Sequence, residues 1–243
     1  MIVMDIFPSW SVILGKAPID WCEENYVGDH AELLGFRVAE YHNTLTNGAY
    51  CLAAILLGRI WHEKIAKRTI KRGHGILLFY CLCLLMTGIT SGLFHATLVW
   101  GWQKADEIFE NLTVLTLFHA TFVNTEKNST NRVHLRILSH GVLAAFGIWV
   151  FPEVFCEVHL IIMAFSTVYR FAFHTGGRLH AMTVFKTASY ALVGFAGWIC
   201  DFAFCTSFST FYLHAYCWHM LTGLALYEAG KLLMSLFEEE KGL

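Results

Sequence analysis

Seven apolar stretches, separated by short polar loops, constrain the fold of this chain more than any other feature of the sequence. A helix needs about 20 predominantly apolar residues to cross a bilayer. The pattern therefore predicts an all-α membrane protein: a seven-transmembrane helix bundle that forms one domain over residues 1–243. The stretches cover roughly residues 38–58, 74–98, 107–123, 136–152, 155–174, 185–202 and 210–234.

Composition excludes two broad classes of protein. Hydrophobic residues make up 56% of the chain and charged residues 15%, whereas disordered chains are poor in hydrophobic residues and rich in charge. The 17 Lys and Arg residues are balanced by 19 Asp and Glu residues. A nucleic-acid-binding protein presents a basic surplus, so no nucleic-acid partner is expected.

Basic residues predict how the bundle is oriented. Of the 17 Lys and Arg residues, 14 fall on one side of the predicted spans, and only Lys16, Arg37 and Lys104 fall on the other. Cytosolic loops carry the excess of basic residues. We therefore expect residues 1–37 to form a segment in the lumen or outside the cell, residues 38–234 to form the bundle, and residues 235–243 to form a cytosolic tail.

Several histidines lie in or near the predicted spans. His119, His140, His159 and His174 are of this kind. An ionisable residue inside the membrane is a functional candidate by default. A single buried histidine is nevertheless often a packing residue with its hydrogen bonds satisfied. The sequence leaves both interpretations open for these four residues.

A second group of polar residues gathers at the lumenal end of the second and third spans. Ser91 precedes His95 by four residues and shares its helix face. Gly101, within residues 98–104, predicts a turn that brings the next span back beside the second. Asp106 should then lie near the height of His95.

The last predicted span begins at the same end with two further histidines, His214 and His219. Together with His95 they provide three histidines, and three protein ligands with a fourth position open to water are the usual plan of a catalytic zinc site. Zinc could activate a water molecule, Asp106 could move protons, and Ser91 could hold the water or the developing oxyanion. The alternative is a polar pore in which these groups satisfy one another.

Oxygen donors are concentrated just before and at the start of the first span. Asp20, Glu23, Asn25 and Glu40 offer the hard ligands that Ca²⁺ prefers. The alternative interpretation is an acidic, solvated segment that caps the first helix and complements its dipole.

Five motifs follow one another between residue 20 and about residue 225. They are DWCEENY at 20–26, VAEYHNTLTN at 38–47, SGLFH at 91–95 followed by Asp106-Glu107, WICD at 198–201 with Phe204-Cys205, and HAYCWHMLTG at 214–223. In this order they resemble the motifs of the alkaline ceramidases, which are seven-span membrane amidases. Thr46 stands where that family usually carries serine.

The resemblance implies roles for particular residues. It implies zinc on His95, His214 and His219, with Ser91 and Asp106 beside the metal-bound water. It implies Ca²⁺ on Asp20, Glu23, Asn25, Glu40 and the carbonyl of Trp21. It also implies a lumenal disulfide between Cys22 and Cys205.

The function implied by the resemblance is zinc-dependent hydrolysis of the amide bond of ceramide, yielding a sphingoid base and a fatty acid. Calcium would have a structural or regulatory role, and the substrate would enter from the bilayer of the endoplasmic reticulum or Golgi. The alternatives are a metal-containing receptor-like protein of the same superfamily, a catalytically inactive relative, and a transporter that relays protons.

Two departures from the family pattern produce specific structural predictions. His214 and His219 are five residues apart instead of four, which rotates one ligand by about 100° on an α-helix. We therefore expect a π-bulge near Tyr216–Trp218. In addition, about six extra residues precede Glu40, so that Glu32 or Asp29 could replace or supplement it at calcium.

Overall fold

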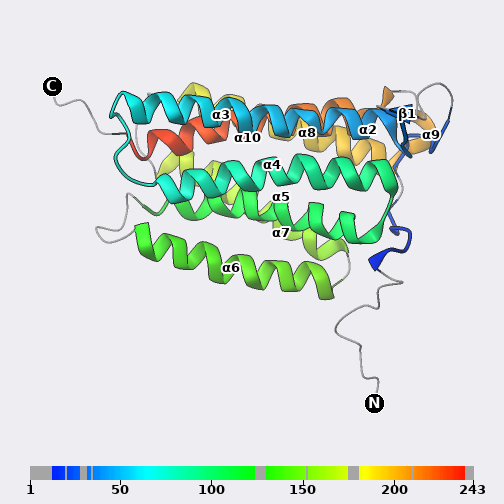
Figure 1. Ribbon diagram of the computed structural model, residues 1–243, viewed down its shortest axis with the longest axis horizontal. Coiled ribbons are helices and arrows are strands. Elements are labelled where there is room, and N and C mark those ends of the chain that lie inside the picture. The colour runs from blue at the N-terminus through cyan, green and yellow to red at the C-terminus, as the bar shows by residue number, and fades with distance from the viewer. Residues whose placement is uncertain are drawn as a thin grey trace, which may run out of the picture.

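The computed structural model describes residues 13–19, 21–27, 32–33, 35–123, 130–151, 153–174, 181–208 and 211–238. Within these residues, seven long helices run roughly side by side (Figure 1), and each corresponds to one predicted apolar stretch. They are α3 (Gly48–Ala66), α4 (His74–Thr97), α5 (Trp100–Ala120), α6 (Thr130–Val150), α7 (Glu153–Phe173), α8 (Ala181–Ala203) and α10 (Met220–Ser235).

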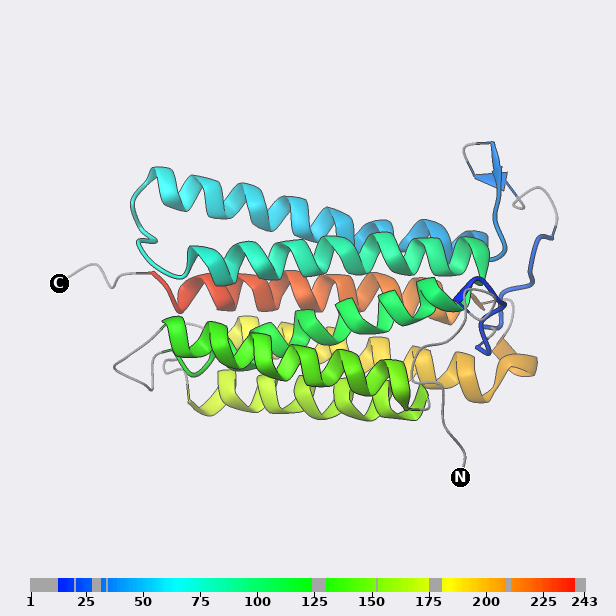
Figure 2. The ribbon, with the colours of Figure 1, turned by 60° about the horizontal axis from the view of Figure 1, so that its bottom comes forward.

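Shorter elements gather at one end of the bundle. The two-residue strands β1 (Glu32–Leu33) and β2 (Phe36–Arg37) pair antiparallel. The helices α2 (Tyr41–Thr46) and α9 (Cys205–Phe208) precede α3 and follow α8, and the π-helix η4 (His214–His219) leads directly into α10. Figures 1 and 2 place these strands, α2 and α9 at the same end, opposite the last turn of α10.

The helices pack so that α10 is surrounded by others. It contacts α3, α8, α5 and α4, while α5 also packs against α4, α6 and α7. Figure 2 shows α10 running through the middle of the bundle, with α3 and α4 on one side of it. Residues on α4, α5 and α10 can therefore line a common interior space.

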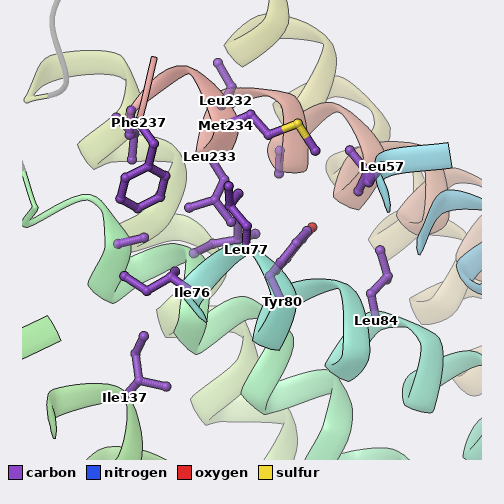
Figure 3. Close-up of a cluster of buried hydrophobic side chains, with 14 of the residues drawn as sticks. Leu57, Ile76, Leu77, Tyr80, Leu84, Ile137, Leu232, Leu233, Met234 and Phe237 are labelled. Atoms are coloured by element: carbon purple, nitrogen blue, oxygen red, sulfur yellow. The ribbon is translucent and has the colours of Figure 1, made fainter. Parts of the chain in front are cut away.

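One end of the bundle holds a core made almost entirely of apolar side chains, which we call the apolar end (Figure 3). Leu57, Leu77 and Leu233 are each at most 1% exposed. The hydroxyl of Tyr80 donates to the Leu226 carbonyl at 2.6 Å, so its polar atom is also satisfied. Gly230 allows the close approach here, because a Cβ at this position would lie 2.5 Å from Leu57.

The outward faces of several helices are also apolar. On α6, Leu135, Leu138 and Leu143 are each between 65% and 68% exposed. Large contiguous apolar surfaces of this kind mark an interaction with a membrane or another protein. In the described residues, three helical segments are long and apolar enough to cross a membrane: His74–Thr97, Asn131–Val150 and Phe155–Phe173. These features give the protein membrane character.

The connection between α4 and α5 is a tight turn, as expected, although it lies earlier than Gly101. Leu98 adopts φ 51° and its N–H donates to the Phe94 carbonyl at 2.6 Å, which ends α4. The helix α5 then begins at Trp100, so Gly101 belongs to its first turn. A Cβ at Gly101 would lie 2.9 Å from the carbonyl oxygen of Ile13, which explains the need for glycine.

Candidate metal centre

Three histidine side chains converge at the end of the bundle opposite the apolar end, and we call this the donor end. His95 lies in the last turn of α4, whereas His214 and His219 begin and end η4. One nitrogen from each ring lies within 4.8 Å of the others. All three side chains are buried, with at most 3% exposure. The structure thus brings together the three ligands predicted from the sequence.

The π-helix explains how two histidines five residues apart reach one point. The helix η4 spans His214–His219 and contains the expected bulge at Tyr216–Trp218, so this prediction is confirmed. Its i→i+5 hydrogen bonding brings the fifth residue back to the face from which a strict α-helix would carry it away.

A glycine on α8 makes room for this wider turn. A Cβ built at Gly197 would lie 2.2 Å from the Cβ of Cys217, which is one of the residues between the two histidines. A Cβ built at Gly194, about one turn earlier on α8, would lie 3.2 Å from the Cys217 carbonyl oxygen. The local backbone of η4 therefore depends on small residues in its neighbour.

Hydrogen bonds fix the orientation of two of the three rings. The Nδ1–H of His95 donates to Glu40 Oε2 at 2.5 Å. The Thr46 hydroxyl donates to the His42 carbonyl at 2.7 Å and accepts from His219 Nδ1 at 2.9 Å. Each of these bonds leaves Nε2 available for a metal, and metal-binding histidines are commonly oriented in this way.

The third ring, His214, is held by stacking. Its centroid lies 3.8 Å from that of Trp21, with an interplanar angle of 28°. Its buried Nδ1 has no hydrogen-bond partner among the described residues. Leaving a buried nitrogen without a hydrogen-bond partner costs free energy unless an ion or a ligand binds to it. The donor set and this nitrogen fit a zinc ion, which binds imidazole nitrogen readily.

Asp201 joins the N-terminal segment to the π-helix. One carboxylate oxygen accepts from the backbone N–H of Cys22 at 3.2 Å, and the other accepts from that of His214 at 3.3 Å. The side chain is 2% exposed. Asp201 belongs to one of the motifs that resemble the family, but no role was predicted for it. The sequence feature that could have indicated a role is an isolated acidic residue at the end of an apolar stretch.

Ser91 and Asp106 meet in the wall of the cavity that the three histidines also line. Ser91 is 1% exposed and its side chain interacts with the Asp106 carboxyl group. The Oδ1 atom of Asp106 is buried without a hydrogen-bond partner in the described part of the chain. One carboxylate oxygen is therefore available to a ligand that enters the site.

A cavity of about 300 Å³ connects these groups. Its wall includes His95, Ser91 and Asp106 at the donor end, and it continues past apolar residues of α7 and α8. Further polar residues of the wall lie on α5 and α7, namely Gln103, Glu107, Glu110 and Glu157. The cavity wall therefore combines a group of polar side chains with a larger apolar part.

The predicted calcium ligands are only partly described. Asp20 and Asp29 lie outside the described residues, and the side chain of Glu32 is likewise not described. Glu23 and Glu40 are 8% and 0% exposed, so these two carboxylates are not solvated, whereas Glu24 between them in the sequence is exposed. Among the described residues, only the three histidines form a group that satisfies metal geometry.

Glu23 caps the first helix, as the alternative interpretation proposed. Its two carboxylate oxygens accept from the backbone N–H groups of His42 at 2.6 Å and Asn43 at 2.8 Å. Burial raises the pKa of Glu23, these two hydrogen bonds lower it, and the nearby charge of Glu40 raises it further. A cation beside two buried carboxylates would relieve this repulsion, and oxygen donors suit calcium.

Of the stretch with extra residues before Glu40, the structure describes the paired strands β1 and β2, whereas residues 28–31 and 34 lie outside the described residues. The N–H of Tyr26 donates to the Ala39 carbonyl at 2.8 Å, so the residues just before and just after this stretch are in direct contact. The backbone N–H of Trp21 donates to Glu40 Oε1 at 3.3 Å. Glu40 therefore keeps its place beside the N-terminal motif.

The two cysteines that the resemblance implied to be bonded lie close together. The Cα atoms of Cys22 and Cys205 are 5.2 Å apart, within the range found for disulfides. Cys22 follows the stacked Trp21, and Cys205 begins α9. A covalent link here would tie the N-terminal segment to the chain that leads into η4.

Comparison with known proteins identifies relatives of this chain. The family model described as Ceramidase matches residues 15–242. The chain is 27% identical to alkaline ceramidase of Drosophila melanogaster over 88% of this chain and 75% of that protein. It is 28% identical to alkaline ceramidase 3 of Mus musculus over 86% of this chain and 79% of that protein.

A shorter match, at 38% identity, is to alkaline ceramidase YPC1 of Saccharomyces cerevisiae, over 37% of this chain and 24% of that protein. The family model covers nearly the whole chain, including every element that carries the three histidines, Ser91 and Asp106. The chain therefore belongs to the alkaline ceramidase family.

Proposed function

We propose that this amide hydrolase of the alkaline ceramidase family cleaves ceramide at a zinc ion held by His95, His214 and His219. One observation carries the proposal: three buried histidine nitrogens lie within 4.8 Å of one another, and Ser91 and Asp106 line the same cavity. When bound there, zinc supplies a Lewis acid that polarises a carbonyl and activates water.

The residues of the chain supply the remaining chemistry. Asp106 accepts a proton from the attacking water and passes it to the amine nitrogen as the C–N bond breaks. Ser91 donates a hydrogen bond to the oxygen that becomes negative in the transition state. Addition of one water molecule across the amide bond yields one fatty acid and one sphingoid base.

The shape of the cavity supports a lipid substrate. Phe165 of α7 and Leu192 of α8 line it, yet they are 57% and 54% exposed. The cavity thus reaches the apolar face of the bundle between these two helices. Ceramide partitions into the bilayer, and we propose that it enters by this lateral route with its amide directed toward Ser91.

Calcium and a disulfide complete the proposal. Asp20, Glu23, Asn25, Glu40 and the Trp21 carbonyl would hold Ca²⁺, supported by the two buried carboxylates described above. The bond between Cys22 and Cys205 is supported by the short Cα separation. Since Glu40 also contacts His95, calcium bound at Glu40 would restrict the motion of His95, a proposed zinc ligand.

We further propose that all seven long helices span the membrane of the endoplasmic reticulum or Golgi, with the donor end in the lumen and the C-terminus in the cytosol. The distribution of basic residues supports this orientation. The polar donor end would then face an oxidising compartment, where a disulfide persists.

An inactive relative would be favoured by a histidine displaced from the others. The five-residue spacing made this interpretation plausible from the sequence, but η4 brings His214 and His219 together. The convergence of the three rings therefore favours an enzyme with a complete ligand set.

The decisive experiment measures zinc content and ceramide hydrolysis on the same purified sample. We expect about one zinc per chain in the wild type, with both zinc and turnover lost in His219→Ala. His174→Ala is a matched control, because His174 is an exposed histidine at the end of α7. A protein that holds no zinc contradicts the mechanism, and zinc without turnover on several ceramides would favour a receptor-like function.

A further inference from the structure

Three histidines outside the metal centre form a continuous line of hydrogen bonds across α5, α6 and α7. His119 Nε2 lies 3.0 Å from His140 Nδ1, and His140 Nε2 lies 3.1 Å from His159 Nε2. His159 Nδ1 then lies 2.6 Å from Asn111 Oδ1. We call His119, His140 and His159 the histidine chain. The proposed hydrolysis uses none of them.

Asn111 fixes the direction of the line. Its Nδ2 donates to the Glu107 carbonyl at 2.9 Å and to Cys156 Sγ at 3.1 Å. These bonds assign Oδ1 as the atom that faces His159, and an amide oxygen can only accept. His159 must therefore carry its hydrogen on Nδ1.

This assignment propagates through the neutral rings, because each has one N–H donor and one acceptor nitrogen. His159 Nε2 accepts from His140 Nε2–H, so His140 Nδ1 accepts from His119 Nε2–H. His119 Nδ1 is then a bare acceptor. This atom is buried, its residue is 8% exposed, and it has no hydrogen-bond partner among the described residues.

The histidine chain has room for one more proton. A proton added at His119 Nδ1 leaves each of the three hydrogen bonds intact. Proton hops along the line reverse only the two bonds between rings, and the bond to Asn111 keeps its direction. A second proton would place two hydrogens between facing nitrogens and break a bond. We propose that His119, His140 and His159 form one proton-binding site that takes up a single proton through His119 Nδ1.

The charged groups around the histidine chain differ at its two ends. Arg136 and Arg170 lie over the Phe122 ring, which is 6.3 Å from the His119 ring. At the other end, Glu107 accepts from Asn111 through its backbone carbonyl. Acids that line the cavity lie on this side, namely Glu107, Glu110 and Glu157.

This asymmetry draws the added charge away from the arginines and toward His159. A positive charge there favours the ionised form of the carboxyl groups along the cavity wall. The histidine chain would therefore couple the pH at the end of α5 near His119 to the rate of hydrolysis at the donor end, a consequence that rests on the proposed function.

The test is ¹⁵N NMR of the whole protein, labelled at histidine and embedded in phospholipid nanodiscs. Ring signals are assigned by single substitutions, with His174→Gln as the exposed reference. We expect Nδ1–H on His159, Nε2–H on the other two rings, and one shared titration midpoint with one proton bound. Three independent midpoints, uptake of a second proton, or the opposite tautomers would overturn the proposal.

Two variants make the test independent of any single substitution. Asn111→Asp keeps the acceptor and adds a negative charge, so the shared midpoint should rise by about 1–3 pH units. His140→Gln removes the middle ring and should replace the shared midpoint with separate ones for His119 and His159. Unchanged titration in both folded variants contradicts a connected site.

Zinc content and ceramide hydrolysis, measured on the same samples, separate the two proposals. A protein without zinc or turnover whose three histidines still titrate together refutes the proposed function alone. An active protein whose histidines titrate separately refutes the proton-binding site alone.

Discussion

The two ends of the bundle are held together by different forces. At the apolar end, Leu57, Leu77 and Leu233 pack with no polar atom to satisfy. At the donor end, by contrast, buried side chains such as Glu40, Asp201 and the three histidines depend on specific partners. The same helices take part in both arrangements, because α4, and η4 continued by α10, run from one end to the other.

This contrast predicts which substitutions change the stability of the protein and which change its catalytic activity. An apolar contact is non-directional, so its loss costs packing energy in proportion to the space left empty. A buried polar contact is directional, and removing one partner leaves the other unsatisfied. We therefore expect the apolar end to determine whether the protein folds and the donor end to determine whether it works.

The largest effect on activity is expected for Asp106→Asn. Asparagine preserves the shape of the side chain but cannot carry the proton, and loss of a general acid–base group typically costs about 10²–10⁴ in rate. Zinc content and thermal stability should remain close to those of the wild type. Steady-state kinetics with metal analysis would check this, and a full rate in Asp106→Asn would remove the proposed proton carrier.

Next in size is the effect of Leu233→Ala at the apolar end. Leu233 is 0% exposed, and such truncations cost about 2–5 kcal/mol of unfolding free energy. The rate per folded molecule should not change. Leu138→Ala on the exposed face of α6 is the matched control and should shift stability by less than about 0.5 kcal/mol. Equal losses in the two variants would contradict the packing described here.

A smaller effect is expected for Thr46→Val. Valine matches threonine in shape but cannot accept from His219 Nδ1, and removing a partner that orients a metal ligand weakens metal affinity by about 10–100-fold. Thr46→Ser keeps the hydroxyl and should bind zinc nearly as well as the wild type. Competition with a zinc chelator measures both, and equal affinities in all three proteins would count against this contact.

The smallest change should come from Glu23→Gln. Glutamine retains one acceptor oxygen for the first turn of α2 but loses the second, a cost of about 1 kcal/mol for a capping interaction. Calcium should also raise the melting temperature less than in the wild type. Thermal unfolding with and without calcium measures both effects. Full calcium stabilisation in the variant would leave Glu23 with a capping role only.

Much of the local structure could be predicted from the sequence. The apolar stretches predicted the long helices, and the five-residue spacing of His214 and His219 predicted the π-helix. The hairpin that brings Asp106 beside His95 also followed from local signals. These features depend on neighbouring residues, where helical periodicity and turn chemistry apply.

The contacts that were missed join residues far apart in the chain. Asp201 bonds to Cys22, 179 residues away, and Thr46 bonds to His219, 173 residues away. In the sequence, the members of the histidine chain likewise stood out only as separate histidines in or near the predicted spans. Helices that are apolar all round do not reveal which face meets which neighbour, so these pairs required the structure.

The glycine opposite the π-helix has a consequence for how this protein can diverge. In the five-residue spacing of His214 and His219, Cys217 lies against α8, where a Cβ at Gly197 would be 2.2 Å from the Cys217 Cβ. A lineage that gains a side chain at Gly197 must therefore lose the extra residue or move the whole helix. The five-residue histidine spacing and the glycine are therefore two parts of one steric arrangement.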